Sequence, residues 1–317
     1  MSESKNLLEK EFTKDVCCEL LPEWKGLDIK ISQLRGGITN KLYRIQSEEG
    51  DYTVRIYGDQ THLFIDREYE AHTIDEMAKI GVGSRLIKFM PERGVTIVEF
   101  IDDAIVLTND HFLDTSLHAK IVDPIRKIHT SGSKLKRIFN PLLEIMKMSV
   151  ILGRIDIEYP EFDIEDIIQR LIKLSSIINI PESEYVACHN DLLADNFILI
   201  KEEAAHKYGS PMYIIDWEYG GMAPKYYDIA DLFQEIMAPR YVEKNIVSEY
   251  CNGVKFDRTL YFVDLFKPFP DIFWFLWSLI QQNVSKIEFD YYSYGQIKYE
   301  NALKNMKRIG MEYGVAV

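Results

Sequence analysis

The sequence of 317 residues predicts an α+β fold in which a small β-rich lobe with one helix precedes a larger, mostly helical lobe. The first observation is that apolar residues between positions 27 and 100 fall in short runs interrupted by glycine and charged turns, as in antiparallel strands. The second is that apolar residues after position 102 recur mostly at helical spacing. We therefore expect lobes at 1–101 and 102–317, with a ligand cleft between them.

The elements of the first lobe follow from apolar periodicity and turn residues. A proline at position 22 and a glycine at position 81 each end a run with helical spacing. A turn, Pro91-Glu92-Arg93-Gly94, separates the last two β-rich runs. The predicted elements are a helix at 3–21, an antiparallel meander within 27–56, a helix at 63–80, and strands at 85–89 and 95–100.

The second lobe is predicted to be helical, with two short strands inside it. Apolar residues recur at the helical period over most of its length, while two runs of three or four apolar residues are too short for helices. The predicted helices lie at 115–129, 141–152, 164–178, 226–237, 241–251, 271–284 and 291–308, and the predicted strands at 197–200 and 213–215.

Composition limits the classes of partner. With 50 acidic and 37 basic residues the net charge is -13, which disfavours binding to nucleic acid or to an anionic membrane. The four cysteines form no CxxC pair and no HExxH motif occurs, so we expect no structural zinc and a reducing compartment. The first 14 residues are polar, and the most apolar run, 272–280, is too short to span a bilayer. A cytoplasmic protein without nucleic-acid or membrane partners is expected.

The strongest chemical signal is the segment from His189 to Asn196, which has the spacing H-x-D-x-x-x-x-N and leads into an apolar run. Phosphoryl transfer needs a carboxylate to accept the proton of the attacking hydroxyl, and Asp191 is of that type. It also needs oxygen ligands for magnesium, and Asn196 can supply one. The alternative is a polar loop in which His189 and Asp191 only cap turns.

A second signal follows about twenty residues later, where the apolar run 213–215 ends in Asp216, Trp217, Glu218, Tyr219 and two glycines. A buried strand has little reason to end in two nearby carboxylates unless a cation meets them. We predict Asp216 as a metal ligand and Glu218 as its support or as a second ligand. The alternative is a solvated strand end, but the order base, asparagine, aspartate is the one that kinase-like folds use.

From about residue 34 to residue 299 the chain resembles the choline/ethanolamine kinase family, a branch of the protein-kinase-like phosphotransferases. Besides the two motifs, the stretch 35–43 resembles the nucleotide loop of that family. The aromatic stretch 273–281, with 287–289 and Tyr294 beyond it, resembles the family's choline pocket. The resemblance implies a bilobal protein-kinase-like fold that uses ATP and Mg²⁺ to convert choline into phosphocholine.

The resemblance also implies roles for individual residues. Asp191 would be the base, with Asn196, Asp216 and possibly Glu218 on magnesium. Arg55 would replace the strand lysine on the phosphates, with Glu70 as its acidic partner and Glu68 as the alternative. The other nucleotide contacts implied are Gly36, Gly37, Thr39 and Asn40 at the phosphates, and Glu99 and Ile101 at adenine. From the residues alone, 36–40 is equally a hairpin turn, and Arg55 is by default an outward-facing cation.

For the amine, the resemblance implies a site formed by Tyr219, Glu235, Trp274, Trp277 and Tyr294 beside Asp191. A quaternary ammonium donates no hydrogen bond, so aromatic faces and a nearby carboxylate are what hold it. The alternative is that 271–280 is a buried helix whose aromatic residues only pack in the core.

Several alternatives stay open. The acceptor could be ethanolamine, an aminoglycoside or another metabolite, and the chain could be an inactive pseudokinase scaffold. The segment Ala238-Pro239-Arg240 departs from the family pattern and puts the exact substrate in doubt. The sequence leaves both a monomer and a homodimer possible.

Overall fold

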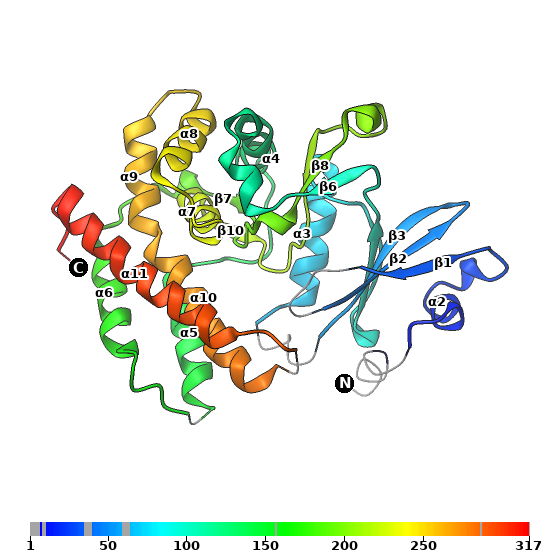
Figure 1. Ribbon diagram of the computed structural model, residues 1–317, viewed down its shortest axis with the longest axis horizontal. Coiled ribbons are helices and arrows are strands. Elements are labelled where there is room, and N and C mark those ends of the chain that lie inside the picture. The colour runs from blue at the N-terminus through cyan, green and yellow to red at the C-terminus, as the bar shows by residue number, and fades with distance from the viewer. Residues whose placement is uncertain are drawn as a thin grey trace.

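A computed structural model describes Leu7 and residues 11–34, 40–58, 64–155, 157–285 and 287–316. Its first part is the antiparallel sheet that the sequence predicts, with five strands in the order β1-β2-β3-β5-β4. The strands are β1 (Lys30–Gln33), β2 (Lys41–Ser47), β3 (Gly50–Ile56), β4 (Leu86–Met90) and β5 (Val95–Glu99). Figure 1 shows this sheet on one side of the molecule and most of the helices on the other.

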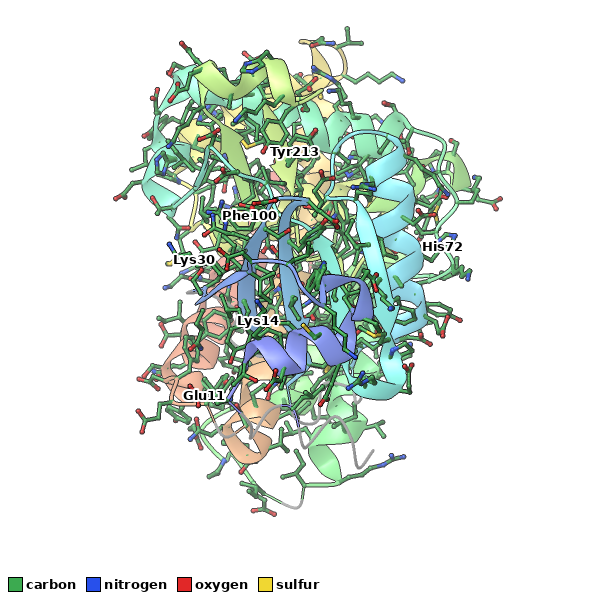
Figure 2. All side chains as sticks on the ribbon, turned by 90° about the vertical axis from the view of Figure 1, so that its right-hand side faces the viewer. Glu11, Lys14, Lys30, His72, Phe100 and Tyr213 are labelled. Atoms are coloured by element: carbon green, nitrogen blue, oxygen red, sulfur yellow. The ribbon has the colours of Figure 1, made fainter. Side chains whose placement is uncertain are left out.

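The two faces of the sheet have different partners because side chains alternate along a strand. Val54, Ile56 and Ile97 face outward and pack with residues of α2 (Lys14–Leu20) and with Trp24. Figure 2 shows α2, with its labelled Lys14, lying across this outer side. Residues 3–6 and 8–10 of the predicted helix 3–21 lie outside the described part.

The opposite face of the sheet carries Arg55. In the antiparallel register Arg55 lies opposite Leu42 on β2 and opposite Thr96 on β5. All three side chains line a cavity between the sheet and the second lobe. Arg55 is therefore turned inward, and the default expectation of an outward-facing cation is wrong for this position.

Helix α3 (Arg67–Lys79) lies between the sheet and the helical part (Figure 1). It begins at Asp66, whose carboxylate accepts hydrogen bonds from the backbone N–H groups of Glu68 and Tyr69. It ends before Gly81, which takes a left-handed φ of 73° that favours glycine. The helix predicted at 63–80 is thus present, and it begins four residues later.

The second lobe is mainly helical, as predicted. Its helices are α4 (His118–Thr130), α5 (Pro141–Gly153), α6 (Ile164–Ile177), α7 (Lys225–Glu235), α8 (Arg240–Cys251), α9 (Phe256–Phe266), α10 (Pro268–Val284) and α11 (Tyr291–Tyr313). The sequence did not predict α9, which follows Lys255 without a side-chain capping hydrogen bond. Helix α10 is buried from Pro268 to Gln281 and packs against α11 and α5. No described helix is long and apolar enough to cross a membrane.

Short strands in the second lobe position the two motif loops. The predicted strands are present as β8 (Phe197–Ile200) and β9 (Met212–Ile214), which pair with each other, and β8 also pairs with β6 (Ala104–Val106). Two further strands that the sequence did not predict, β7 (Tyr185–Cys188) and β10 (Gly221–Pro224), pair with each other. Because Cys188 lies opposite Gly221, the loop that follows β7 meets the loop that precedes β10.

Candidate active site

The two motif loops are joined by direct hydrogen bonds. The backbone N–H of Ile215 donates to the carbonyl of Asn196 over 3.0 Å. His189 Nε2 lies 2.8 Å from the carbonyl oxygen of Ile215, and the His189 ring packs on Trp217. The structure therefore brings together the segments that carry Asp191 and Asp216, which are separate in the sequence.

The backbone of the first motif loop is held by carboxylates of α7 that sequence reasoning missed. Asp228 accepts hydrogen bonds from the N–H groups of His189 (3.0 Å) and Asn190 (2.6 Å). Asp231 accepts one from the N–H of Leu192 over 2.6 Å. Their signal in the sequence is two acids three residues apart on the apolar face of a predicted helix, where a carboxylate needs a partner.

Asp228 also has a partner on its other side. His129 Nε2 lies 2.9 Å from the Asp228 carboxylate, and His129 Nδ1 bonds the Tyr250 hydroxyl. Cys188 lies close enough for the three residues to resemble a metal site, but its thiol donates to the carbonyl of Ala223. These hydrogen bonds explain the group as a closed buried network that fixes the loop.

Asp191, the predicted base, is buried in this loop. Its side chain is 6% exposed, and Oδ1 has no hydrogen-bond partner in the described part of the chain. Burial, followed by the nearby charges of Asp231 and Asp216, raises the pKa of Asp191 well above the ordinary range of an aspartate. Asn196 donates from Nδ2 to the Asp191 carbonyl over 2.9 Å, which leaves its Oδ1 available as an oxygen ligand.

Asp216 follows β9 and has a left-handed φ of 67°, which is uncommon outside glycine and turns the backbone sharply out of the strand direction. Its carboxylate forms an ion pair with Arg55. Arg55 also forms an ion pair with Glu70, whose side chain is 1% exposed, whereas Glu68 is exposed. The partner of Arg55 in the structure is thus Glu70.

Glu218 completes a cluster of alternating charges. Arg67 lies 3.3 Å and Arg55 3.7 Å from the Glu218 carboxylate, and Asn40 Nδ2 donates to it over 3.4 Å. Burial, then the charge of Asp216, raises the pKa of Glu218 to about 7. A proton or a cation at this position is therefore favoured more than it would be beside an exposed glutamate.

The carboxylate oxygens of Glu70, Asp216 and Glu218 lie within 4.8 Å of one another, which is a spacing that a metal ion can bridge. Glu70 is already engaged by two arginines, Arg55 and Arg67. Asp216 and Glu218, with Asn196 across the site, supply the hard oxygen donors that Mg²⁺ prefers. The residues present fit a divalent cation.

A cavity of about 330 Å³ opens beside this cluster, between the sheet and the two motif loops. Its walls are mostly apolar, while Arg55, Asn196 and Asp216 form its polar end. Glu99 and Ile101, predicted near adenine, line it together with Asn40. Gly36, Gly37 and Thr39, predicted at the phosphates, lie outside the described residues.

The residues predicted for the amine form a connected aromatic series. The ring centroids of Tyr219 and Trp274 are 5.2 Å apart, those of Trp274 and Trp277 5.6 Å, and those of Trp277 and Tyr294 6.4 Å. Glu235 lies next to this series, where it accepts from the Tyr294 hydroxyl. Near-complete burial of the two tryptophans fits core packing as well, so the feature that favours a ligand is the set of carboxylates beside the rings.

Glu235 also has a cationic partner that sequence reasoning missed. Lys298 on α11 lies 2.6 Å from Glu235 and donates to the carbonyl of Gln234 over 2.9 Å. Both charged side chains are buried, so the charge of Glu235 is already balanced inside the protein. In the sequence only the four-residue spacing from Tyr294 places Lys298 on the same helix face.

The close approach of α3 to the Asp216 loop requires glycine at position 220. A Cβ there would lie 2.6 Å from Cγ2 of Thr73 on α3 and 3.1 Å from the carbonyl of Trp217. Gly220→Ala is expected to lower the free energy of unfolding by about 1–3 kcal/mol, measured by chemical denaturation.

Thr73→Ser should restore most of this loss, since it removes the clashing methyl group and keeps the hydroxyl that donates to the Tyr69 carbonyl over 2.9 Å. Gly153→Ala is the matched control, because a Cβ there meets no heavy atom within 4 Å. Equal stability of Gly220→Ala and Gly153→Ala would contradict the proposed close packing.

Comparison with known proteins gives consistent matches. The sequence model of the family "Choline/ethanolamine kinase" matches residues 31–259. A probable ethanolamine kinase of Arabidopsis thaliana is 26% identical over 92% of this chain and 84% of its own length.

Solved structures of this fold are also similar to the chain. A choline/ethanolamine kinase family protein from Mesorhizobium loti is 25% identical with a TM-score of 0.76, covering 92% of this chain and 93% of its own. The choline kinase LicA from Streptococcus pneumoniae is 24% identical with a TM-score of 0.77, covering 93% of this chain and 99% of its own. The bilobal, protein-kinase-like fold expected from the sequence is therefore confirmed.

Proposed function

The chain belongs to the choline/ethanolamine kinase family, and on that premise we propose that it transfers the γ-phosphoryl group of ATP to the hydroxyl of choline, giving phosphocholine and ADP. The observation that carries the proposal is that Asn196 and Asp216 form the polar end of one cavity, while Asp191 lies next to them: its carbonyl accepts from Asn196, and the charge of Asp216 acts on its carboxylate. A base and two oxygen ligands beside a nucleotide-sized space are the parts that phosphoryl transfer needs.

In this proposal the cavity between the lobes holds ATP. Its apolar walls, including Leu42 and Val98, would enclose the adenine next to Glu99 and Ile101. The guanidinium of Arg55 would neutralise the phosphates, held in place by its ion pair with Glu70. This arrangement places the negative end of the nucleotide toward the motif loops.

Asn196, Asp216 and Glu218 are proposed to hold Mg²⁺. The ion would neutralise charge on the transferring phosphoryl group. The acidic cluster around Asp216 already contains two arginines, so the chain itself limits the charge repulsion among these carboxylates. Asp191 is proposed to orient the acceptor hydroxyl and to take its proton as the new P–O bond forms and the bond to ADP breaks.

The amine of the acceptor is proposed to lie against Tyr219, Trp274, Trp277 and Tyr294, beside Glu235. The faces of these rings attract a cation through their quadrupoles, which suits a trimethylammonium group. The rate would then come mainly from holding the hydroxyl near Asp191 and the phosphoryl group.

Ethanolamine is the second candidate acceptor, supported by a separate observation. Asp191 Oδ1, Asn190 Oδ1 and Tyr227 Oη are buried and have no hydrogen-bond partner among the described residues. A primary ammonium can donate hydrogen bonds to such atoms, whereas a trimethylammonium cannot.

A coupled assay of ADP release tests the proposal with choline, ethanolamine, dimethylaminoethanol and kanamycin as acceptors. We expect magnesium-dependent turnover with the amino alcohols and none with kanamycin. Turnover with kanamycin alone would favour an aminoglycoside kinase. No ADP release with any acceptor would favour a non-catalytic scaffold.

Trp277→Ala is expected to raise the KM for choline about 5- to 30-fold with little change in kcat, because it removes an aromatic face that contacts the amine equally in the ground and transition states. The matched control is Phe275→Leu on the same helix, since Phe275 packs against Phe162 and Tyr299. An unchanged choline KM in Trp277→Ala would show that the amine site lies elsewhere.

A further inference from the structure

Four buried carboxylates surround the residues proposed for the amine, and they differ in what balances their charge. Glu235 is paired with Lys298. Asp271 accepts from the side-chain amides of Gln234 (2.6 Å) and Asn305 (3.2 Å). Burial raises the pKa of Asp271 to about 7, and the field of Lys298 opposes this rise. Asp191 and Asp231 form no ion pair with any described residue.

Asp231 is the more deeply buried of these two unpaired carboxylates, with no exposed surface. The donors that reach it are neutral: the N–H of Leu192 bonds Oδ2 over 2.6 Å, and Trp274 Nε1 bonds Oδ1 over 2.9 Å. Burial raises the pKa of Asp231, and the negative charges of Glu235 and Asp228 add to this rise. The positive charge of Lys298 also acts on Asp231, but Lys298 is paired with Glu235. A cation from outside the chain would therefore stabilise the anionic form of Asp231.

The two bonds of Asp231 also give it a bridging position. Leu192 adjoins Asp191 in the motif loop, and Trp274 belongs to the aromatic series proposed for the amine. One carboxylate therefore links the loop of the proposed base to the wall of the proposed amine site. Its charge also reaches the proposed ligand site, because it contributes to the raised pKa of Asp191 and of Tyr294.

We propose that Asp231 determines specificity for a cationic acceptor, because the ammonium group of the substrate balances its unpaired charge. Its hydrogen bonds to Leu192 and Trp274 also fix the position of the aromatic series relative to the loop of Asp191. This inference rests on the proposed function. The ammonium is then attracted mainly by Asp231 and less by Glu235, whose charge Lys298 neutralises. The inference applies to quaternary and primary ammonium groups alike, since both carry one positive charge.

The test compares choline with 3,3-dimethylbutan-1-ol, the neutral acceptor in which carbon replaces the nitrogen. Wild-type enzyme should prefer choline in kcat/KM. Asp231→Asn should reduce that preference about tenfold or more, because a unit charge near a partly desolvated ammonium is worth at least that much. The value of kcat/KM should fall mainly for choline and change less for the neutral alcohol.

Asp228→Asn is the matched control. Asp228 lies one turn earlier on α7, is equally buried and holds the same loop, but its charge is paired with His129. We expect Asp228→Asn to lower kcat/KM for both acceptors by similar factors, so the preference for choline stays within about twofold of wild type.

The outcomes separate the inference from the function on which it rests. If the wild-type enzyme phosphorylates no amino alcohol, the proposed function fails. If it does so but Asp231→Asn lowers kcat/KM for both acceptors equally, the role of Asp231 is only structural and the inference is wrong. The inference is also wrong if the wild-type enzyme shows no preference for choline over the neutral alcohol. Asp231→Ser, which removes the charge and keeps one acceptor oxygen, is measured by the same ratio should Asp231→Asn fail to fold.

Discussion

Asp191→Asn is expected to lower kcat about a thousandfold or more with every acceptor that the wild-type enzyme uses. The substitution keeps the shape of the side chain but removes the oxygen that would accept the hydroxyl proton. In the structure that oxygen is buried and has no other partner among the described residues, so no other hydrogen bond explains its position. Coupled ADP release at saturating ATP and acceptor measures the effect.

Stability provides the control for this variant. Burial and nearby carboxylates raise the pKa of Asp191, which means that folding disfavours its ionised form relative to the unfolded chain. Replacing it by a neutral amide should therefore leave the thermal unfolding temperature unchanged or higher. A variant that keeps a tenth of the wild-type kcat would contradict the role of Asp191 as base, and one that loses activity through unfolding would not support it.

Arg55→Met is expected to abolish detectable turnover and to lower the free energy of unfolding by about 3 kcal/mol. Arg55 is 9% exposed and forms ion pairs with Glu70 and Asp216. Without it, Arg67 is the one cationic partner that the buried Glu70 keeps among the described residues. The loss of stability is the cost of leaving a buried charge incompletely balanced, and chemical denaturation measures it.

The double variant Arg55→Met with Glu70→Gln separates this structural effect from catalysis. Removing the charge of Glu70 should restore most of the stability, because the most deeply buried partner of Arg55 is then neutral, Glu218 keeps Arg67, and Asp216 is partly exposed. Turnover should stay absent, since the proposed contact of Arg55 with the phosphates is still missing. Recovery of activity together with stability would show that Arg55 has no direct role at the nucleotide.

Much of the fold could be predicted from local patterns. The alternation of apolar residues in β3 and β5, and the helical spacing of α3, depend on neighbours in the sequence, and these elements are present. Helix α9 and strands β7 and β10 could not be predicted in this way. Helix α9 begins at Phe256, after Lys255, whose side chain makes no capping hydrogen bond. Strands β7 and β10 pair with each other across residues 189–220, so their near neighbours in the sequence do not indicate them.

The residues of the candidate site also differ in whether local sequence patterns can predict them. Asp191, Asn196 and Asp216 could be predicted because their spacing within each motif has a chemical reason. The inward orientation of Arg55 depends on the pairing register of β3, which its own sequence does not reveal. Asp228 and Asp231 were missed because their partners, the N–H groups of His189, Asn190 and Leu192, are about forty residues away in the chain.

The central claim is that oxygen-bearing side chains of two motif loops direct phosphoryl transfer from a nucleotide to an amino alcohol. The most direct test is ³¹P NMR of wild-type protein with ATP, magnesium and either choline or ethanolamine. We predict a phosphomonoester signal of the amino alcohol that grows in step with ADP and is missing without magnesium. Formation of ADP with inorganic phosphate alone, or no consumption of ATP with either acceptor, would contradict the claim.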